Sequence, residues 1–189
     1  MFTYISFVGF NKISHGSLES VVIESKQYLS SHKDSQLLIF SDLTGRAIDF
    51  DLSGTVKDVE KRLRVYLSKD QSNHVGAGRP SLGVIAREIS LLPHHWEWLL
   101  NQKSGSSGVI RTLIDEKMKK APLPKDIIKS AQETTYNFLL AVAGDLPDYE
   151  DAIRYLYRKD KEKFEECIST WHKDIRKHAM ALSADVFKN

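Results

Sequence analysis

Three aspartates, Asp42, Asp49 and Asp51, have side chains that could bind a metal ion. Asp49 and Asp51 alternate with apolar residues in AIDFDL, which places both on one face of a predicted strand, and Asp42 precedes the turn in DLTGR. Ca²⁺ and Mg²⁺ prefer carboxylate oxygens as ligands. The spacing does not match an EF-hand loop. We therefore interpret the three carboxylates as solvent-facing charges at a sheet edge and expect no metal.

Cys167, His172 and His178 are the second group, because thiolates and imidazoles bind zinc. On a continuous helix, Cys167 and His178 share one face and His172 lies elsewhere. A zinc site needs converging ligands, usually four. We interpret the group as a buried free cysteine and two surface histidines. Because Cys167 is the one cysteine of the chain, no internal disulfide is possible.

His94 and His95, beside Trp96, are the best candidates for proton chemistry. Their place in the first turn of a predicted helix favours an exposed edge. The sequence has no nucleophile motif, P-loop, GxGxxG or HExxH. We expect a protein that is not an enzyme and has no cofactor, although an active site assembled from distant residues would leave no such motif.

The elements that position these residues belong to an ordinary globular chain, since 41% of its 189 residues are hydrophobic and 28% are charged. No apolar run approaches the ~20 residues needed to span a membrane. The N-terminal MFTYISFVGFNK has no basic region before its apolar stretch and no small-residue cleavage site, so it predicts a first strand. We expect a cytoplasmic protein without membrane contact.

An α+β fold is predicted, and its first segment, residues 1–68, has the order ββαββα. Predicted strands are TYISFVG, a short one near Lys12–Ser14, LLIFS and AIDFDL, with Gly45 in the turn before the last. SLESVVIESKQYL has helical apolar spacing. A second helix follows Thr55, which can form a capping box with Asp58. Residues 69–83, with two glycines and a proline, predict a linker.

The last segment, residues 121–189, predicts a helical bundle. Pro122 and Pro124 can end one helix and begin another. Gly144 and Pro147, in GDLPDYED, interrupt the next pattern of apolar residues.

Residues 84–120 resemble the ribbon-helix-helix fold of small bacterial repressors. The signs are a short strand that ends in a leucine–proline step, a helix after Pro93, the turn SGSSG, and a second helix that contains VIRTLI. The resemblance implies that two chains pair their strands and share one core. The expected dimer core, to which Leu100 and Met118 add apolar surface, comprises Ile89, Leu91, Trp96, Leu99, Ile110, Leu113 and Ile114.

Ribbon-helix-helix proteins place the paired ribbon in the major groove of double-stranded DNA, and the start of the second helix meets a phosphate. Residues 76–125 carry eight basic and four acidic residues, whereas the whole chain has a net charge of +2. GAGRPS also resembles a minor-groove hook. The expected DNA-binding residues of a transcriptional regulator are Arg79, Arg87, Glu88, Ser90, Ser104, Ser106 and Ser107.

The phase of the ribbon leaves a second interpretation open. If Ile89 and Leu91 are core residues, the outward face consists of Glu88 and Ser90, and a glutamate is electrostatically unfavourable in a groove between phosphates. Either a bulge at Leu91–Leu92 resets the phase, or residues 84–120 only dimerise. The alternative function is thus a non-enzymatic interaction module without DNA binding.

The whole chain also resembles a bacterial family, domain of unknown function 2239. The resemblance rests on GRPSLGVIAREISLLPHHWEWL, AGDLPDYEDA and DIRKHA. It implies a cytoplasmic bacterial protein with this order of segments, and it implies no activity.

Overall fold

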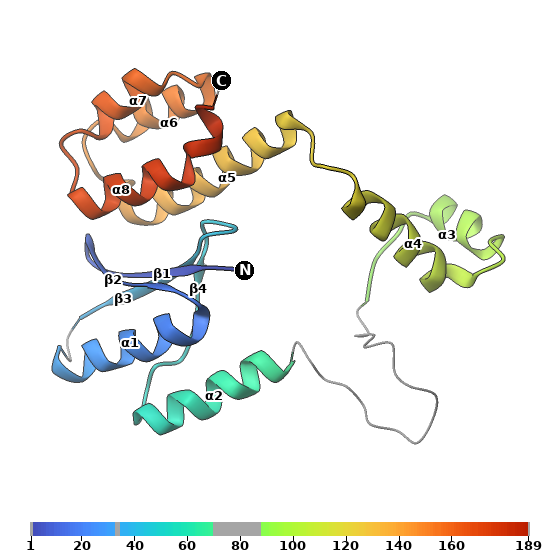
Figure 1. Cartoon of the computed structure of the whole chain (residues 1–189), viewed down its shortest axis with the longest axis horizontal. Coiled ribbons are helices and arrows are strands. Elements are labelled where there is room, and N and C mark those ends of the chain that lie inside the picture. Colours follow the sequence, from blue (N-terminus) through green and yellow to red (C-terminus); the bar gives the residue numbers. More distant parts are fainter. Residues whose placement is uncertain (1, 33–34, 70–87, 189) are drawn as a thin grey trace. The chain divides into compact units, whose positions relative to one another are not determined.

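The computed structural model describes residues 2–32, 35–69 and 88–188. Strands and helices alternate in the N-terminal part, and helices alone follow (Figure 1). The N-terminal elements are β1 (Tyr4–Val8), β2 (Asn11–Gly16), α1 (Leu18–Ser31), β3 (Leu37–Ser41), β4 (Ala47–Ile48) and α2 (Val56–Lys69). The later elements are α3 (Pro93–Leu100), α4 (Gly105–Lys119), α5 (Pro124–Ala143), α6 (Tyr149–Arg158), α7 (Lys161–Ile168), α8 (Lys173–Leu182) and η1 (Ala184–Val186). The predicted α+β class and the ββαββα order are confirmed.

The four strands form one antiparallel sheet in the order β2-β1-β3-β4. The last strand is shorter than the sequence predicted, because only Ala47 and Ile48 of AIDFDL pair with β3. Asp51 then accepts a hydrogen bond from the backbone N–H of Ser53 at 2.9 Å, which turns the chain away from the sheet. Phe50 nevertheless packs on the core beneath the sheet, as the alternation of AIDFDL indicated.

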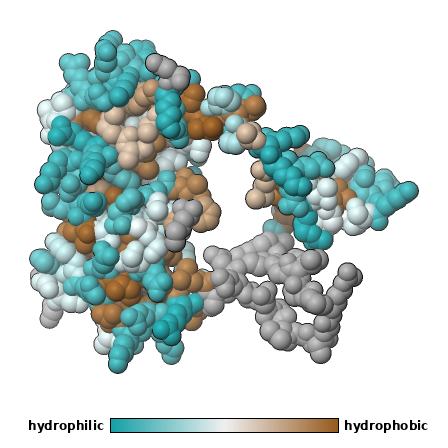
Figure 2. Space-filling view, viewed as in Figure 1, coloured by the Kyte–Doolittle hydropathy of each residue, from teal (hydrophilic) through white to brown (hydrophobic). Residues whose placement is uncertain are grey.

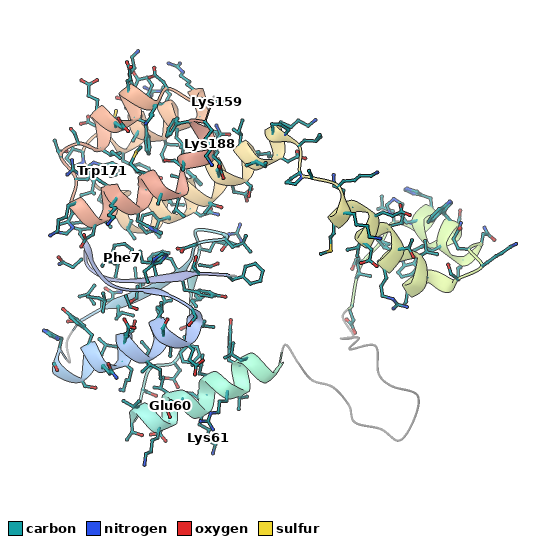
Figure 3. All side chains as sticks on the ribbon, in the orientation of Figure 1. Phe7, Glu60, Lys61, Lys159, Trp171 and Lys188 are labelled. Carbon is teal, nitrogen blue, oxygen red and sulfur yellow. The ribbon has the colours of Figure 1, made fainter. Side chains whose placement is uncertain are left out.

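The two faces of the sheet carry two different cores, because successive side chains of a strand point in opposite directions. Ile5, Phe7 and Phe40 belong to the core formed with α5–α8, and Phe7 points toward these helices (Figure 3). On the other face, Ile39 packs with Val22 and further apolar residues of α1 and α2. The sheet therefore lies between two helical layers (Figure 1).

One compact unit thus contains both ends of the described chain, the residues within Met1–Leu67 and within Pro124–Asn189. Segments 1–68 and 121–189 share their core through Phe138 of α5. Its ring centroid lies 5.6 Å from that of Phe7 and 5.2 Å from that of Phe40. Residues Ser68–Leu123 form the second unit, which contains α3 and α4. No helix among the described residues is long and apolar enough to cross a membrane.

Local signals explain several helix boundaries. The predicted capping box at α2 is confirmed, because Thr55 N–H donates to Asp58 Oδ2 at 2.8 Å and Asp58 N–H donates to Thr55 Oγ1 at 3.3 Å. Pro124 begins α5, as predicted. Asp160 begins α7 by accepting from the N–H of Lys163. Trp171, which follows α7, donates from Nε1 to the carbonyl of Pro147 at 2.8 Å and so ties two loops of the bundle together.

The turn between β3 and β4 is held against α5. Thr134 Oγ1 donates to the carbonyl of Leu43 at 3.0 Å, and Asn137 Nδ2 donates to that of Thr44 at 2.9 Å. Gly45 completes the turn with a φ of 66°, as predicted, and a Cβ at this position would lie 1.9 Å from the carbonyl oxygen of Thr134. This position therefore requires glycine for two reasons, its positive φ and the close approach of α5.

We expect Gly45→Ala to lower the free energy of unfolding by about 3 kcal/mol, because the turn must leave α5 and also adopt a strained φ. Urea unfolding followed by circular dichroism measures the change. Gly9→Ala is the matched control, because Gly9 also has a positive φ of 54° but has open space around it. It should cost about 1 kcal/mol. Equal losses in the two variants would contradict the role of the contact between Gly45 and α5.

Candidate functional site

The predicted ribbon falls partly outside the described residues, which exclude Arg79, Arg87 and residues 84–86. Residues 88–92 form neither strand nor helix in the single chain. A ribbon of this fold finds its hydrogen-bonding partner only in a second chain, so its pairing stays a prediction. Glu88, Ile89 and Ser90 are all exposed, and Leu91 is half-buried.

The first helix of this unit, α3, begins as the sequence predicts, with extended Leu92 before Pro93 in the first turn. Of its apolar residues, Leu99 is buried, with 3% of its surface exposed. Trp96 is more than one-third exposed, and Leu100, predicted on the buried side, is 78% exposed. α4 does not cover Leu100 in the single chain, because a pair of short helices can cover only the strip along which they touch, and the burial of Leu100 in a dimer stays a prediction.

The second helix, α4, repeats this pattern. Val109 is buried and Ile110 is half-buried, and α4 contacts α3. Leu113 and Ile114 are each about half exposed, at 49% and 51%. Figure 2 shows apolar side chains at the surface of this unit. Among the residues of this unit that the structure describes, the large exposed apolar ones are Ile89, Leu92, Trp96, Trp98, Leu100, Leu113, Ile114, Met118 and Leu123.

The serines of SGSSG do not cap α4 with their side chains. Ser104 occupies the N-cap position, but its side chain makes no capping hydrogen bond, because its backbone φ of −91° and ψ of 7° lie outside the extended conformation typical of an N-cap. Ser106 and Ser107 lie inside the first turn rather than before it. Among the described residues, no side-chain cap occupies the N–H groups that begin α4, and these groups carry partial positive charge.

A second candidate site brings together residues that lie far apart in the sequence. Asp42 Oδ2 lies 2.7 Å from Nε2 of His15 on β2, and Asp42 Oδ1 lies 3.5 Å from Nε2 of His178 on α8. Among the described residues, none donates a hydrogen bond to Oδ1 of Asp42. The interpretation of Asp42 as a solvent-facing charge is wrong, because its side chain is only 16% exposed and lies between a half-exposed histidine and a buried one. No group of described histidine, cysteine and carboxylate residues could hold a metal ion.

The interpretation of His178 as a surface residue is wrong, because only 8% of its side chain is exposed. Its ring packs against Phe138, with the two centroids 4.6 Å apart. Burial lowers the pKa of His178 from 6.5 to about 4, against the opposing attraction of Asp42, because the charged ring loses its hydration. Cys167 is half-buried rather than buried, and burial raises its pKa. His172 is the N-cap of α8, where its Nδ1 accepts from the N–H of Asp174.

One family model matches residues 3–183, nearly all of the chain. This family, DUF2239, is described as an uncharacterised protein conserved in bacteria. The chain belongs to this family. Within the DUF2239 match, GDLPDYED connects α5 to α6 and DIRKHA lies on α8. The latter motif contributes His178 to the cluster and Asp174, whose Oδ2 accepts from the N–H of Lys12 on β2 at 3.1 Å.

The DUF2239 chain is also similar to isoleucine–tRNA ligase of Wolbachia pipientis wMel. The two are 24% identical over 149 residues, which cover 74% of this chain and 13% of the ligase. The chain thus spans only a small part of that ligase's length. No solved structure matches it.

The buried His178 should make the protein less stable in acid. Below pH 6.5 the unfolded chain protonates this histidine, while the folded chain stays neutral there until about pH 4, so the free energy of unfolding falls across that window. We expect a loss on the order of 3 kcal/mol between pH 7 and pH 4 from this residue. Urea unfolding at several pH values compares the wild type with His178→Gln, in which this part of the loss should vanish. His94→Gln, at an exposed histidine, is the control and should lose stability in acid as the wild type does. If His178→Gln shows the same pH dependence of the free energy of unfolding as the wild type, His178 is not the cause of the loss.

Proposed function

We propose that the protein is a homodimeric binding module that assembles through residues 84–120 and acts without catalysis. The observation that carries the proposal is the apolar surface left by α3 and α4. In this unit Leu99 and Val109 are buried, whereas Trp98, Leu113 and Ile114 are about half exposed or more. A surface that collects this many large apolar side chains is typical of an interaction site.

The free energies of burial and of association favour a partner that covers many of these residues together. Removing one large apolar side chain from water contributes about 1.5–3 kcal/mol when it was fully exposed, and these are about half exposed. Association costs roughly 4–15 kcal/mol in lost freedom of motion. The free energy gained by covering one or two of these side chains is therefore smaller than the cost of association. The gain from covering the whole α3–α4 surface is larger than that cost.

A second copy of the chain is the partner that fits best. The resemblance of residues 84–120 to the ribbon-helix-helix fold supplies an arrangement in which each copy covers the other, with the segment around Ile89 paired to its own copy. Such an interface is self-complementary, so the same residues from both chains meet around a two-fold axis. Ile89, Leu91 and Trp96 then become core residues without any change in the sequence pattern.

The second candidate function is DNA binding by this dimer, as a transcriptional regulator. Two observations favour it. Residues 76–125 hold the positive excess of the chain, and the first N–H groups of α4 lack a side-chain cap at the position where this fold meets a phosphate. The exposed Ile89 beside Glu88 and Ser90 is the observation that places it second, since an apolar and an acidic residue on the ribbon are unfavourable in a DNA groove.

We expect the wild type to have twice its chain mass of 21.5 kDa in light scattering at micromolar concentration. A double variant, Leu113→Glu with Ile114→Glu, should be monomeric, because dimer formation would bury two carboxylates without partners. Leu140→Glu is the matched control, since Leu140 is 52% exposed on α5 in the other unit. It should stay dimeric. A wild type with the mass of one chain would refute the proposal.

DNA binding is tested by titrating the wild type with mixed duplex DNA at ~50 mM salt. Affinity should fall steeply with added salt, because phosphate contacts release counterions. Arg87→Ala should weaken DNA binding by about 1–3 kcal/mol and leave the dimer intact, while Arg64→Ala on α2 should bind like the wild type. A dimer that fails to retain DNA at this salt concentration identifies a module for self-association alone.

A further inference from the structure

A cavity of ≈ 360 Å³ lies between α7 and α8, within the unit that contains the sheet. This volume falls in the usual range of small-molecule sites. Its walls come from two helices joined by a short connection, so the cavity is local to the C-terminal bundle. The residues that line it are Glu165, Ile168, Lys173, Arg176, Lys177 and Met180.

Three of the lining residues are cations on one face of α8. Lys173, Arg176 and Lys177 are spaced i, i+3 and i+4, so their side chains are neighbours. Like charges at this spacing destabilise a helix unless an anion balances them. Glu165, on α7, lies 3.7 Å from Nζ of Lys161, so its charge is already shared. The cavity therefore carries a net positive charge.

Arg176 contributes a guanidinium group that the protein holds in a fixed position. Its Nη1 donates to the carbonyl of Ser169 at 2.9 Å, which holds the guanidinium group in place. Its Nε is buried, and none of the described residues accepts a hydrogen bond from it. A buried N–H is out of reach of water and of a dissolved ion alike, so an anion in the cavity would meet the other N–H groups of this guanidinium.

Apolar side chains complete the cavity. Ile168 is 2% exposed and Met180 is half-buried, and both line the same space as the cations. The nearest carboxylate on α8, that of Asp174, accepts from the backbone N–H of Lys12 and does not line the cavity. The ligand that matches these walls has a compact anionic end and a small apolar part.

We propose that this cavity binds a small phosphorylated molecule, with its phosphoryl group on Lys173, Arg176 and Lys177 and its apolar part against Ile168 and Met180. A phosphate group carries a charge of about −1.5 to −2. This charge matches three cations offset by one carboxylate. The arginine supplies a planar fork of N–H donors that matches two phosphate oxygens, and the two lysines supply positive charges on flexible side chains. The proposal is independent of self-association through residues 84–120.

The position of Met180 allows a direct test by NMR. The chain has three methionines, Met1, Met118 and Met180, so a sample labelled at the methionine methyl groups gives three signals. Phenyl phosphate and inorganic phosphate are the two probes, each titrated at constant ionic strength against sodium chloride. Met180→Leu assigns the signal. We expect the Met180 signal to shift saturably with both probes, with phenyl phosphate binding more tightly, while the Met118 signal stays in place.

Two double variants decide whether the cations hold the probe. Lys173→Gln with Lys177→Gln should raise the dissociation constant about tenfold or more, because two charge-assisted contacts are lost. Lys57→Gln with Lys61→Gln removes the same charge at the same spacing from α2 and should change nothing. Both lysine pairs are exposed, and circular dichroism verifies folding. A Met180 signal that fails to shift, or that shifts equally in the Lys173 and Lys177 variant, overturns the proposal.

Discussion

The contact on which the structure depends is the packing of Phe138 from α5 against Phe7 and Phe40 of the sheet. Without it, the sheet would have one covered face and one apolar face exposed to water. With it, a sheet near the N-terminus and a bundle near the C-terminus become one unit. His178 lies at the edge of the same aromatic cluster, so the burial that keeps its ring neutral is a by-product of this packing.

Local features of this fold could be predicted from the sequence, since their causes lie within a few residues. The capping box of Thr55 and Asp58, the positive φ of Gly45 and the start of α5 at Pro124 are of this kind. The length of β4 could not, because it depends on where the chain turns away from β3. AIDFDL keeps its alternating burial past Ile48, but its pairing stops there although β3 continues to Leu38 and Leu37, which pair with β1.

The cluster of His15, Asp42 and His178 could not be predicted from the sequence either. Its members come from β2, the end of β3 and α8, separated by 27 residues between His15 and Asp42 and by far more between Asp42 and His178. No motif spans such distances. One signal was present, however: Asp42 follows a buried strand directly, where its side chain could meet the helices that cover the sheet. The cations of the α8 cavity were equally visible in KDIRK, but only the structure shows that they line one cavity with Ile168 and Met180.

The aromatic contact that joins the two ends of the chain determines what a cut in the backbone would do to the fold. Residues 68–123 leave the first unit after α2 and return to it at α5, so their connections begin and end in the same folded body. A protease that cut the backbone once between α2 and α3 would leave two fragments, each carrying part of the core around Phe138. The cut would sever the covalent link without removing the apolar contacts between Phe7, Phe40 and Phe138. The two fragments would then stay together through this packing, as the two parts of a split protein do.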